Sequence, residues 1–168
     1  MNAITTELKR PSTATLEHTI SSERPDSAME CRFTAARGPT ECCVHMHASA
    51  DHLAQLRRLV CATLCEAGVG PDERDGAVLA LSELVSNAIR ACGTNVPLLV
   101  AVNVKDSVEI TVHDPEPVFA VPERRAALDD PDAESGRGLA LLDVIAPGWE
   151  MHPDPGGGKH ITCRILGI

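Results

Sequence analysis

The chain has 168 residues, a formal net charge of −9 and only 2% aromatic residues. An acidic surface repels nucleic-acid phosphates, and two Phe, one Trp and no Tyr offer few platforms on which bases could stack. Direct binding of DNA or RNA is therefore not expected, and any effect on transcription is expected to act through a protein partner. No apolar run approaches the roughly 20 residues that span a bilayer, so we expect a soluble protein.

Residues 1–40 contain eleven Ser or Thr and three Pro, without sustained hydrophobic periodicity. A segment of this composition buries too little apolar area to offset its conformational entropy. We therefore predict a disordered tail over residues 1–40 and one folded domain over residues 41–168. The seven cysteines, an odd number, and the lack of a secretory signal segment indicate a reducing cytoplasm.

The hydrophobic pattern of the domain switches between the periods of strands and helices. Strands are predicted near 42–49, 97–104, 107–113, 149–153 and 159–166, and helices over 51–67, 71–92 and 137–145. Grouped strands with helices able to cover one face predict an α+β fold. The expected architecture is a two-layer α/β sandwich with a mixed, mostly antiparallel sheet and helices on one face.

The predicted helix over 71–92 carries the most informative pair of residues. Glu83 and Asn87 are four positions apart and project from the same side, roughly opposite the apolar stripe. A carboxylate can take a proton from an attacking hydroxyl, and an amide oxygen can ligate Mg²⁺. This pairing suits nucleotide-dependent phosphoryl transfer. A solvated polar face is the alternative that the helix alone leaves open.

An acid follows the strand predicted over 107–113. Asp114 comes directly after this alternating segment, where a carboxylate can accept a hydrogen bond from the exocyclic amine of a base. The stretch from Pro115 to Ser135 is rich in Pro and acids, which is typical of a mobile loop. A turn-forming Asp before Pro is the alternative interpretation of Asp114.

Two glycine-rich segments complete the pattern. Gly136, Arg137, Gly138 and Leu139 lead into a short helix whose N-terminal amides can cradle phosphates. Three further glycines and Lys159 precede the last strand. Neither segment fits a Walker P-loop or a dinucleotide-binding fingerprint, because the additional Gly or hydroxyl positions of those motifs are missing.

Four neighbouring residues could be interpreted as a metal site, namely Cys42, Cys43, His45 and His47. Its spacing matches no standard zinc motif, and its members alternate with apolar residues along a strand. We interpret them as ordinary strand residues.

In their order along the chain, these motifs resemble the histidine-kinase-like ATPase (GHKL, or Bergerat) fold. The likeness rests on Glu-x-x-x-Asn in a helix, Asp after a strand, a lid segment, Gly-Arg-Gly-Leu, and Gly-Gly-Gly-Lys before the last strand. It covers about residues 42–166. Within this fold, the chain has a short single-domain form that is similar to the branch of anti-sigma factors and serine protein kinases. A histidine-kinase role is not expected, because no helix pair with a phosphoacceptor His precedes the domain.

The resemblance implies roles for the matching residues. Glu83 matches the catalytic general base. The residues implied in cofactor binding are Asn87, Asp114, Gly136, Arg137, Gly138, Leu139 and Lys159. Within this set Asn87 matches the Mg²⁺ ligand, Asp114 matches the acid that reads the adenine amine, and the glycines around Arg137 match those of the phosphate loop. The implied cofactors are ATP and Mg²⁺.

The sequence also departs from the family pattern. The first glycine box of such proteins usually reads Asp-x-Gly-x-Gly, whereas this chain has Asp-Pro-Glu-Pro-Val over 114–118. The replacement makes the backbone stiffer and more acidic, so we expect lid closure to be less complete than in relatives. Ala91 stands where relatives often carry a His after the metal-binding Asn.

The implied function is that of an ATP-binding anti-sigma regulatory protein. In this interpretation a serine/threonine protein kinase phosphorylates an anti-sigma antagonist and, in its other state, sequesters a sigma factor. A nucleotide-gated protein-binding module without significant kinase activity is the alternative, and a domain with a degenerate pocket that acts through its surface is the third. The expected partners are the sigma factor, the antagonist and a second copy of the chain, without direct contact to nucleic acid or membrane.

Overall fold

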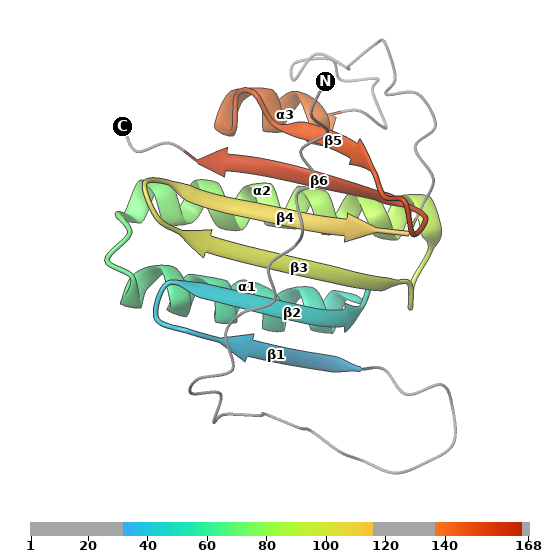
Figure 1. Ribbon diagram of the computed structural model, residues 1–168, viewed down its shortest axis with the longest axis horizontal. Coiled ribbons are helices and arrows are strands. Elements are labelled where there is room, and N and C mark those ends of the chain that lie inside the picture. The colour runs from blue at the N-terminus through green and yellow to red at the C-terminus, as the bar shows by residue number, and fades with distance from the viewer. Residues whose placement is uncertain (1–31, 116–136, 166–168) are drawn as a thin grey trace.

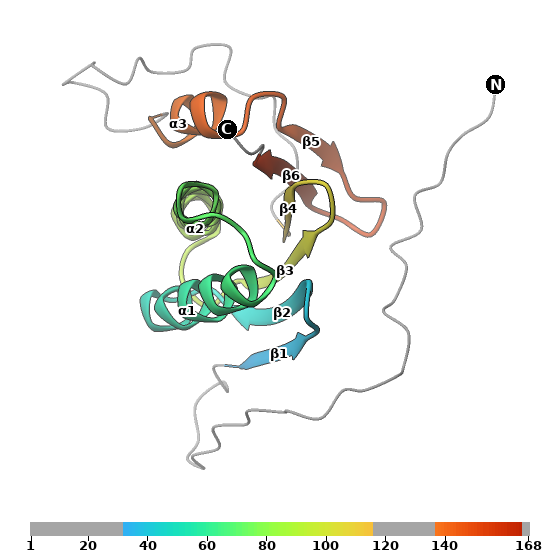
Figure 2. The same cartoon turned by 90° about the vertical axis from the view of Figure 1, so that its left-hand side faces the viewer.

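The computed structural model describes residues 32–115 and 137–165. Figure 1 shows a sheet seen face-on with helices behind it, and the edge-on view in Figure 2 separates the two layers. The elements are β1 (Phe33–Arg37), β2 (Glu41–His47), α1 (Ala50–Glu66), α2 (Pro71–Cys92), β3 (Pro97–Val104), β4 (Val108–Asp114), α3 (Arg137–Ile145), β5 (Glu150–Pro153) and β6 (Lys159–Ile165). The predicted α+β sandwich with helices on one face is confirmed.

The six strands form one sheet in the order β1-β2-β3-β4-β6-β5. All five strand pairings in the described residues are antiparallel, so the expectation of a mixed sheet was wrong in this detail. The reason lies in the connections. The helix pair α1–α2 returns the chain to the end of the sheet where β2 stopped, and β3 therefore runs back antiparallel to it.

Local chemistry sets the ends of the two long helices. Ser49 caps α1, because its hydroxyl oxygen accepts a hydrogen bond from the backbone N–H of His52 at 3.1 Å. Pro71 occupies the first turn of α2, where a missing N–H costs nothing. Gly93 ends α2 at φ +86°, a conformation that favours glycine. The predicted helix 71–92 is thus reproduced.

The core lies between the sheet and the helices. Alternate residues of the central strands point toward the helices, and one stripe of each long helix points toward the sheet. The largest fully buried side chains are Met46, Leu56, Leu64, Leu81, Leu84, Ile110, Leu142, Val44, Val60, Val85, Val100 and Val102. This continuous set fixes the strand register, because a slip by one residue would turn the apolar face of a strand toward solvent.

The sheet begins earlier than the sequence predicted. Residues 33–37 were assigned to the tail, but they form edge strand β1 and pair with β2. The segment Phe-Thr-Ala-Ala-Arg is short and has one large apolar residue, so its alternation is weak in isolation. Pairing with β2 supplies the stabilisation, and the domain boundary at residue 41 is corrected accordingly. Residues 1–31 lie outside the described residues.

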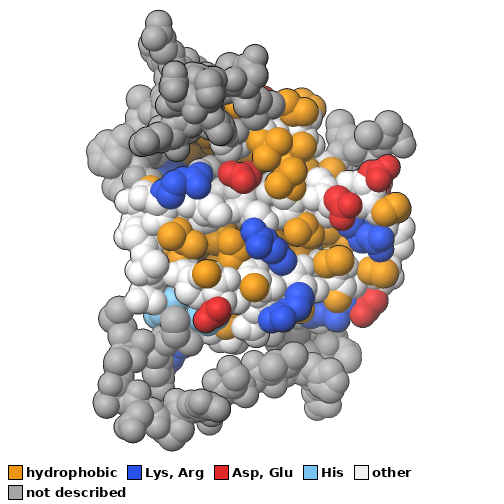
Figure 3. Space-filling view, turned by 180° about the vertical axis from the view of Figure 1, so that it is seen from behind, with side chains coloured by type: hydrophobic (Ala, Val, Ile, Leu, Met, Phe, Trp, Pro, Cys, Tyr) orange, Lys and Arg blue, Asp and Glu red, His pale blue; other side chains and the backbone are white. Residues whose placement is uncertain are grey.

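The outer side of the helix layer, seen in Figure 3, mixes apolar side chains with both signs of charge. Two large apolar residues are exposed among the described residues, Leu79 and Val144. In the described part of the chain, no helix combines the length and the apolar character needed to cross a membrane.

The buried thiols give a test of the core. Burial raises the pKa of Cys42 and of Cys163 to about 11. A raised pKa keeps each thiol protonated near neutral pH, where only the thiolate is nucleophilic. We expect the exposed Cys61 and Cys65 to be alkylated by iodoacetamide at least about tenfold faster, as measured by mass spectrometry over time. A denatured sample is the control, and equal rates in the native protein would contradict the assignment of these thiols to the core.

Candidate functional site

Four elements carry the predicted site residues along one edge of the sandwich. They are the second half of α2, the first turn of α3, the last residue of β4 and the first residue of β6. A contact between helix and sheet marks this edge, since the Cys92 thiol at the end of α2 donates to Asp114 Oδ1 at the end of β4 at 3.5 Å. The contacts of the implied nucleotide-binding residues form two groups, one at the start of α3 and one at the end of β4.

Glu83 and Asn87 both face the beginning of α3. A Cβ added at Gly138 would lie 2.5 Å from Glu83 Oε2 and 3.4 Å from Asn87 Oδ1. Both side chains are half-buried, so they are not an ordinary solvated helix face. A residue with a side chain at this position would force the Glu83 carboxylate to move, whereas glycine leaves it in place. The structure therefore brings together the predicted base, the predicted Mg²⁺ ligand and a predicted phosphate-loop glycine.

The carboxamide of Asn87 has a cationic neighbour. The guanidinium of Arg90, one turn further along α2, donates a hydrogen bond to Asn87 Oδ1. This oxygen is the atom that would ligate Mg²⁺. Because Arg90 is exposed, its side chain can swing away and leave the oxygen to a metal, or stay and contact an anionic phosphate.

The carboxylate of Asp114 is held by a cation as well. Lys159 Nζ lies 3.2 Å from Asp114 Oδ2, and the two side chains are only 10% and 4% exposed. Asp114 and Lys159 are direct partners in the β4–β6 pairing. Both side chains are buried on the face of the sheet that the helices cover. The ion pair fixes the orientation of the acid at the end of β4.

The turn between β5 and β6 packs on the same strand end. Gly158 has φ +87°, and a Cβ there would lie 2.2 Å from the backbone oxygen of Asp114. No other residue fits such an approach, because both the conformation and the distance exclude a side chain. The glycine run noted in the sequence therefore positions the strand end that carries Asp114.

The other predicted residues are placed less fully. Leu139 lies half-buried in the first turn of α3, and the backbone of Arg137 begins that helix. Gly136 and most of the predicted lid, residues 116–135, lie outside the described residues. The catalytic and binding roles of the whole set stay predictions.

Sequence reasoning missed two of these contacts. Arg90 was not singled out, although its position three residues after Asn87 places it on the same helix face. The pairing of Lys159 with Asp114 was also missed. The signal for this ion pair was an acid at the end of one buried strand and an amine at the start of another. It could not be used, because a lid and a helix separate the two strands in the sequence and their pairing is not evident from it.

Comparison with protein families identifies the class. A family model described as the histidine kinase-like ATPase domain matches residues 46–165. The match spans most of the chain and every described element from α1 to β6, and the chain belongs to this family. Membership supports the binding of ATP. A comparison with curated proteins gave no match.

Gly138→Ala tests the packing at this edge. The added methyl group would lie 2.5 Å from Glu83 Oε2, which is the end of a flexible side chain, so the carboxylate moves and the domain stays folded. We expect MgATP affinity, measured by calorimetry, to fall about tenfold, or about 1.4 kcal/mol. The matched control is Gly76→Ala on α2, where the new Cβ would be 3.5 Å from Ile165. Equal affinity in the two variants would show that the close approach of Gly138 is unimportant.

A double-mutant cycle tests the buried ion pair. Asp114→Asn leaves the Lys159 ammonium buried without its carboxylate, and Lys159→Met leaves the carboxylate without its ammonium. Each change should cost about 3–5 kcal/mol of unfolding free energy. The double variant should recover much of that loss, because no buried charge remains without its opposite. Urea unfolding measures all four proteins, and strictly additive losses would contradict the coupling.

Proposed function

We propose that this chain is an ATP-binding anti-sigma regulatory protein that acts as a serine/threonine protein kinase on an anti-sigma antagonist and sequesters a sigma factor. The proposal rests on the motif order, which resembles that branch of the family, and on one observation above the others. Glu83 and Asn87 both lie against Gly138 in the first turn of α3. The residues proposed as base and as metal ligand are thus close to a residue of the proposed phosphate loop.

In this proposal each group has a defined task. Glu83 accepts the proton of the partner's serine or threonine hydroxyl as that oxygen attacks the γ-phosphate. Asn87 would hold Mg²⁺, which would neutralise charge on the phosphates, and the backbone amides at the start of α3 would bind phosphate oxygens. Asp114 accepts a hydrogen bond from the adenine amine, and Lys159 holds that acid in place.

A second candidate function draws support from two contacts. Arg90 occupies the oxygen of Asn87, and Lys159 occupies an oxygen of Asp114. If these cations remain in place with nucleotide bound, the site binds ATP without organising Mg²⁺ for transfer. The protein would then be a nucleotide-gated binding module for the same partners, the sigma factor and its antagonist, in the cytoplasm.

Glu83→Gln separates the two functions. The amide keeps the size of the side chain and removes the proton acceptor, so ATP affinity should change little while phosphotransfer falls by about 10²–10⁴-fold. Phosphotransfer is measured with labelled ATP, Mg²⁺ and candidate antagonist proteins encoded by genes near that of this protein. Calorimetry measures ATP binding. Asp75→Asn is the matched control, an exposed acid on the same helix.

The outcomes distinguish the candidates. Transfer by the parent and the control but not by Glu83→Gln supports the kinase. ATP binding without transfer to any candidate, together with nucleotide-dependent capture of a sigma factor, favours the binding module. Absence of ATP binding at millimolar nucleotide would refute both.

A further inference from the structure

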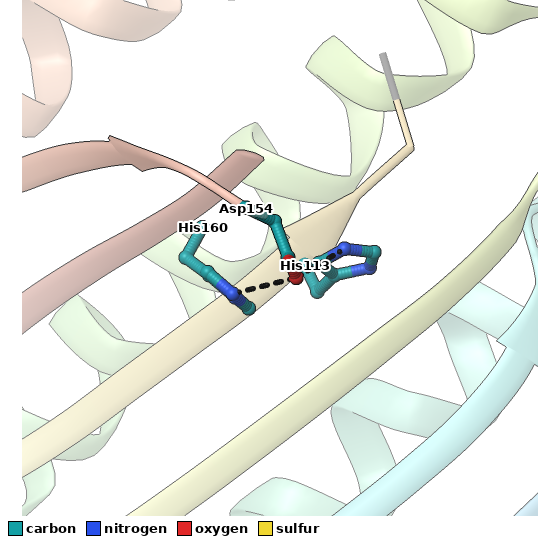
Figure 4. Close-up of side chains that lie close together, drawn as sticks. All are labelled: His113, Asp154 and His160. Atoms are coloured by element: carbon teal, nitrogen blue, oxygen red, sulfur yellow. Dashed lines mark ion pairs between the residues drawn. The ribbon is translucent and has the colours of Figure 1, made fainter. Parts of the chain in front are cut away.

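The face of the sheet turned away from the helices carries a second cluster of polar side chains. His113 on β4 and His160 on β6 are direct partners in the strand register. Asp154 follows β5 in the turn that leads into β6. Figure 4 shows the two imidazoles converging on the carboxylate between them. None of the three side chains belongs to the candidate nucleotide site, which lies on the opposite face.

The three side chains present ligand atoms to a common point. Asp154 Oδ2 lies 3.0 Å from His113 Nε2 and 2.8 Å from His160 Nε2. The possible ligand atoms of the group all lie within 4.8 Å of one another. A tetrahedral zinc ion, with bonds of about 2.0–2.1 Å, separates its ligand atoms by about 3.3 Å. To hold an ion, the two distances from Asp154 Oδ2 to the imidazole nitrogens would lengthen by a few tenths of an ångström, and the two nitrogens already lie within 4.8 Å of each other.

Backbone contacts hold the carboxylate and the two imidazoles in these positions. The Gly156 N–H donates to Asp154 Oδ1 at 2.7 Å, which turns the other carboxylate oxygen toward the imidazoles. The pKa of Asp154 lies below its ordinary value, chiefly because of that hydrogen bond and further because of the two histidines. The strand register holds the histidine rings side by side, with centroids 4.9 Å apart. All three side chains are about three-quarters buried.

We propose that His113, Asp154 and His160 form a binding site for a divalent transition-metal ion of the zinc type. Two imidazole nitrogens and one carboxylate oxygen are a ligand set that such ions favour, and solvent supplies the remaining coordination. Mg²⁺ prefers an all-oxygen shell and does not compete for this set. The site is therefore chemically distinct from the Mg²⁺ that accompanies a nucleotide.

The position of the site gives the ion a structural effect. His113 directly precedes Asp114, and His160 directly follows Lys159. A metal bound across β4, β6 and the turn after β5 would cross-link three segments of the sheet at the end where the ion pair lies. Binding to the native state alone raises stability by mass action, so the melting temperature should rise with Zn²⁺ concentration.

The test uses the full chain without an affinity tag, titrated with Zn²⁺ by calorimetry and with Co²⁺ by visible absorption. We expect one ion per chain at this site, with affinity unchanged by millimolar Mg²⁺. His113→Gln and His160→Gln should each weaken binding by at least about tenfold and abolish the Zn²⁺-dependent rise in melting temperature. Melting in the presence of a chelator verifies that each variant is folded. A variant that proves unfolded is replaced by Asp154→Asn, which keeps the acceptor for Gly156.

Two controls make the result decisive. His152 is the strand partner of His160, but the His152 imidazole contacts Glu150 and not Asp154. The His152→Gln variant should therefore bind metal like the parent. Cys61→Ser with Cys65→Ser removes the exposed thiols on α1 and should also leave the site intact. Binding that survives loss of His113 and His160, or a thiolate-to-cobalt charge-transfer band that vanishes with the two cysteines, would overturn the proposal.

Discussion

Helix α2 packs on several sides, and the rest of the structure is arranged around it. It contacts α1, α3, β4 and β6. Its apolar stripe faces the sheet, where Leu81, Leu84 and Val85 are fully buried or nearly so. A helix held in this way cannot rotate without emptying the core, since interiors are closely packed. The orientation of Glu83 and Asn87 is therefore set by hydrophobic burial on the other side of the same helix.

The elements were largely predictable because their signals are local. The long helices have a Ser cap, an initial Pro and terminal glycines, and the strands alternate cleanly. The misses have non-local causes. Strand β1 depends on its partner β2 for stability. The direction of each strand depends on the end of the sheet to which the preceding connection leads the chain. Sequence reasoning also examined the histidines of β2 as metal ligands while overlooking His113 and His160, whose proximity depends on a pairing between distant segments.

The candidate site shows the same division. The spacing of Glu83 and Asn87 was enough to place them together, but that Gly138, a predicted phosphate-loop glycine, lies beside them became evident only from the fold. What could not be predicted was the electrostatic surroundings. Two cations, Arg90 and Lys159, hold the oxygens assigned to metal and adenine. The Lys159 ammonium reduces the cost of burying the Asp114 carboxylate, whereas Arg90 is exposed and contacts a half-buried carboxamide.

Neighbouring residues at the end of β4 and at the start of β6 point to opposite faces of the sheet. Asp114 and Lys159 turn inward, whereas His113 and His160 turn outward. One insertion or deletion within either strand would invert this parity, sending imidazoles into the core and an acid or an amine to the surface. The two strands therefore cannot change in length, and any change in chain length must fall in the turns beyond their ends.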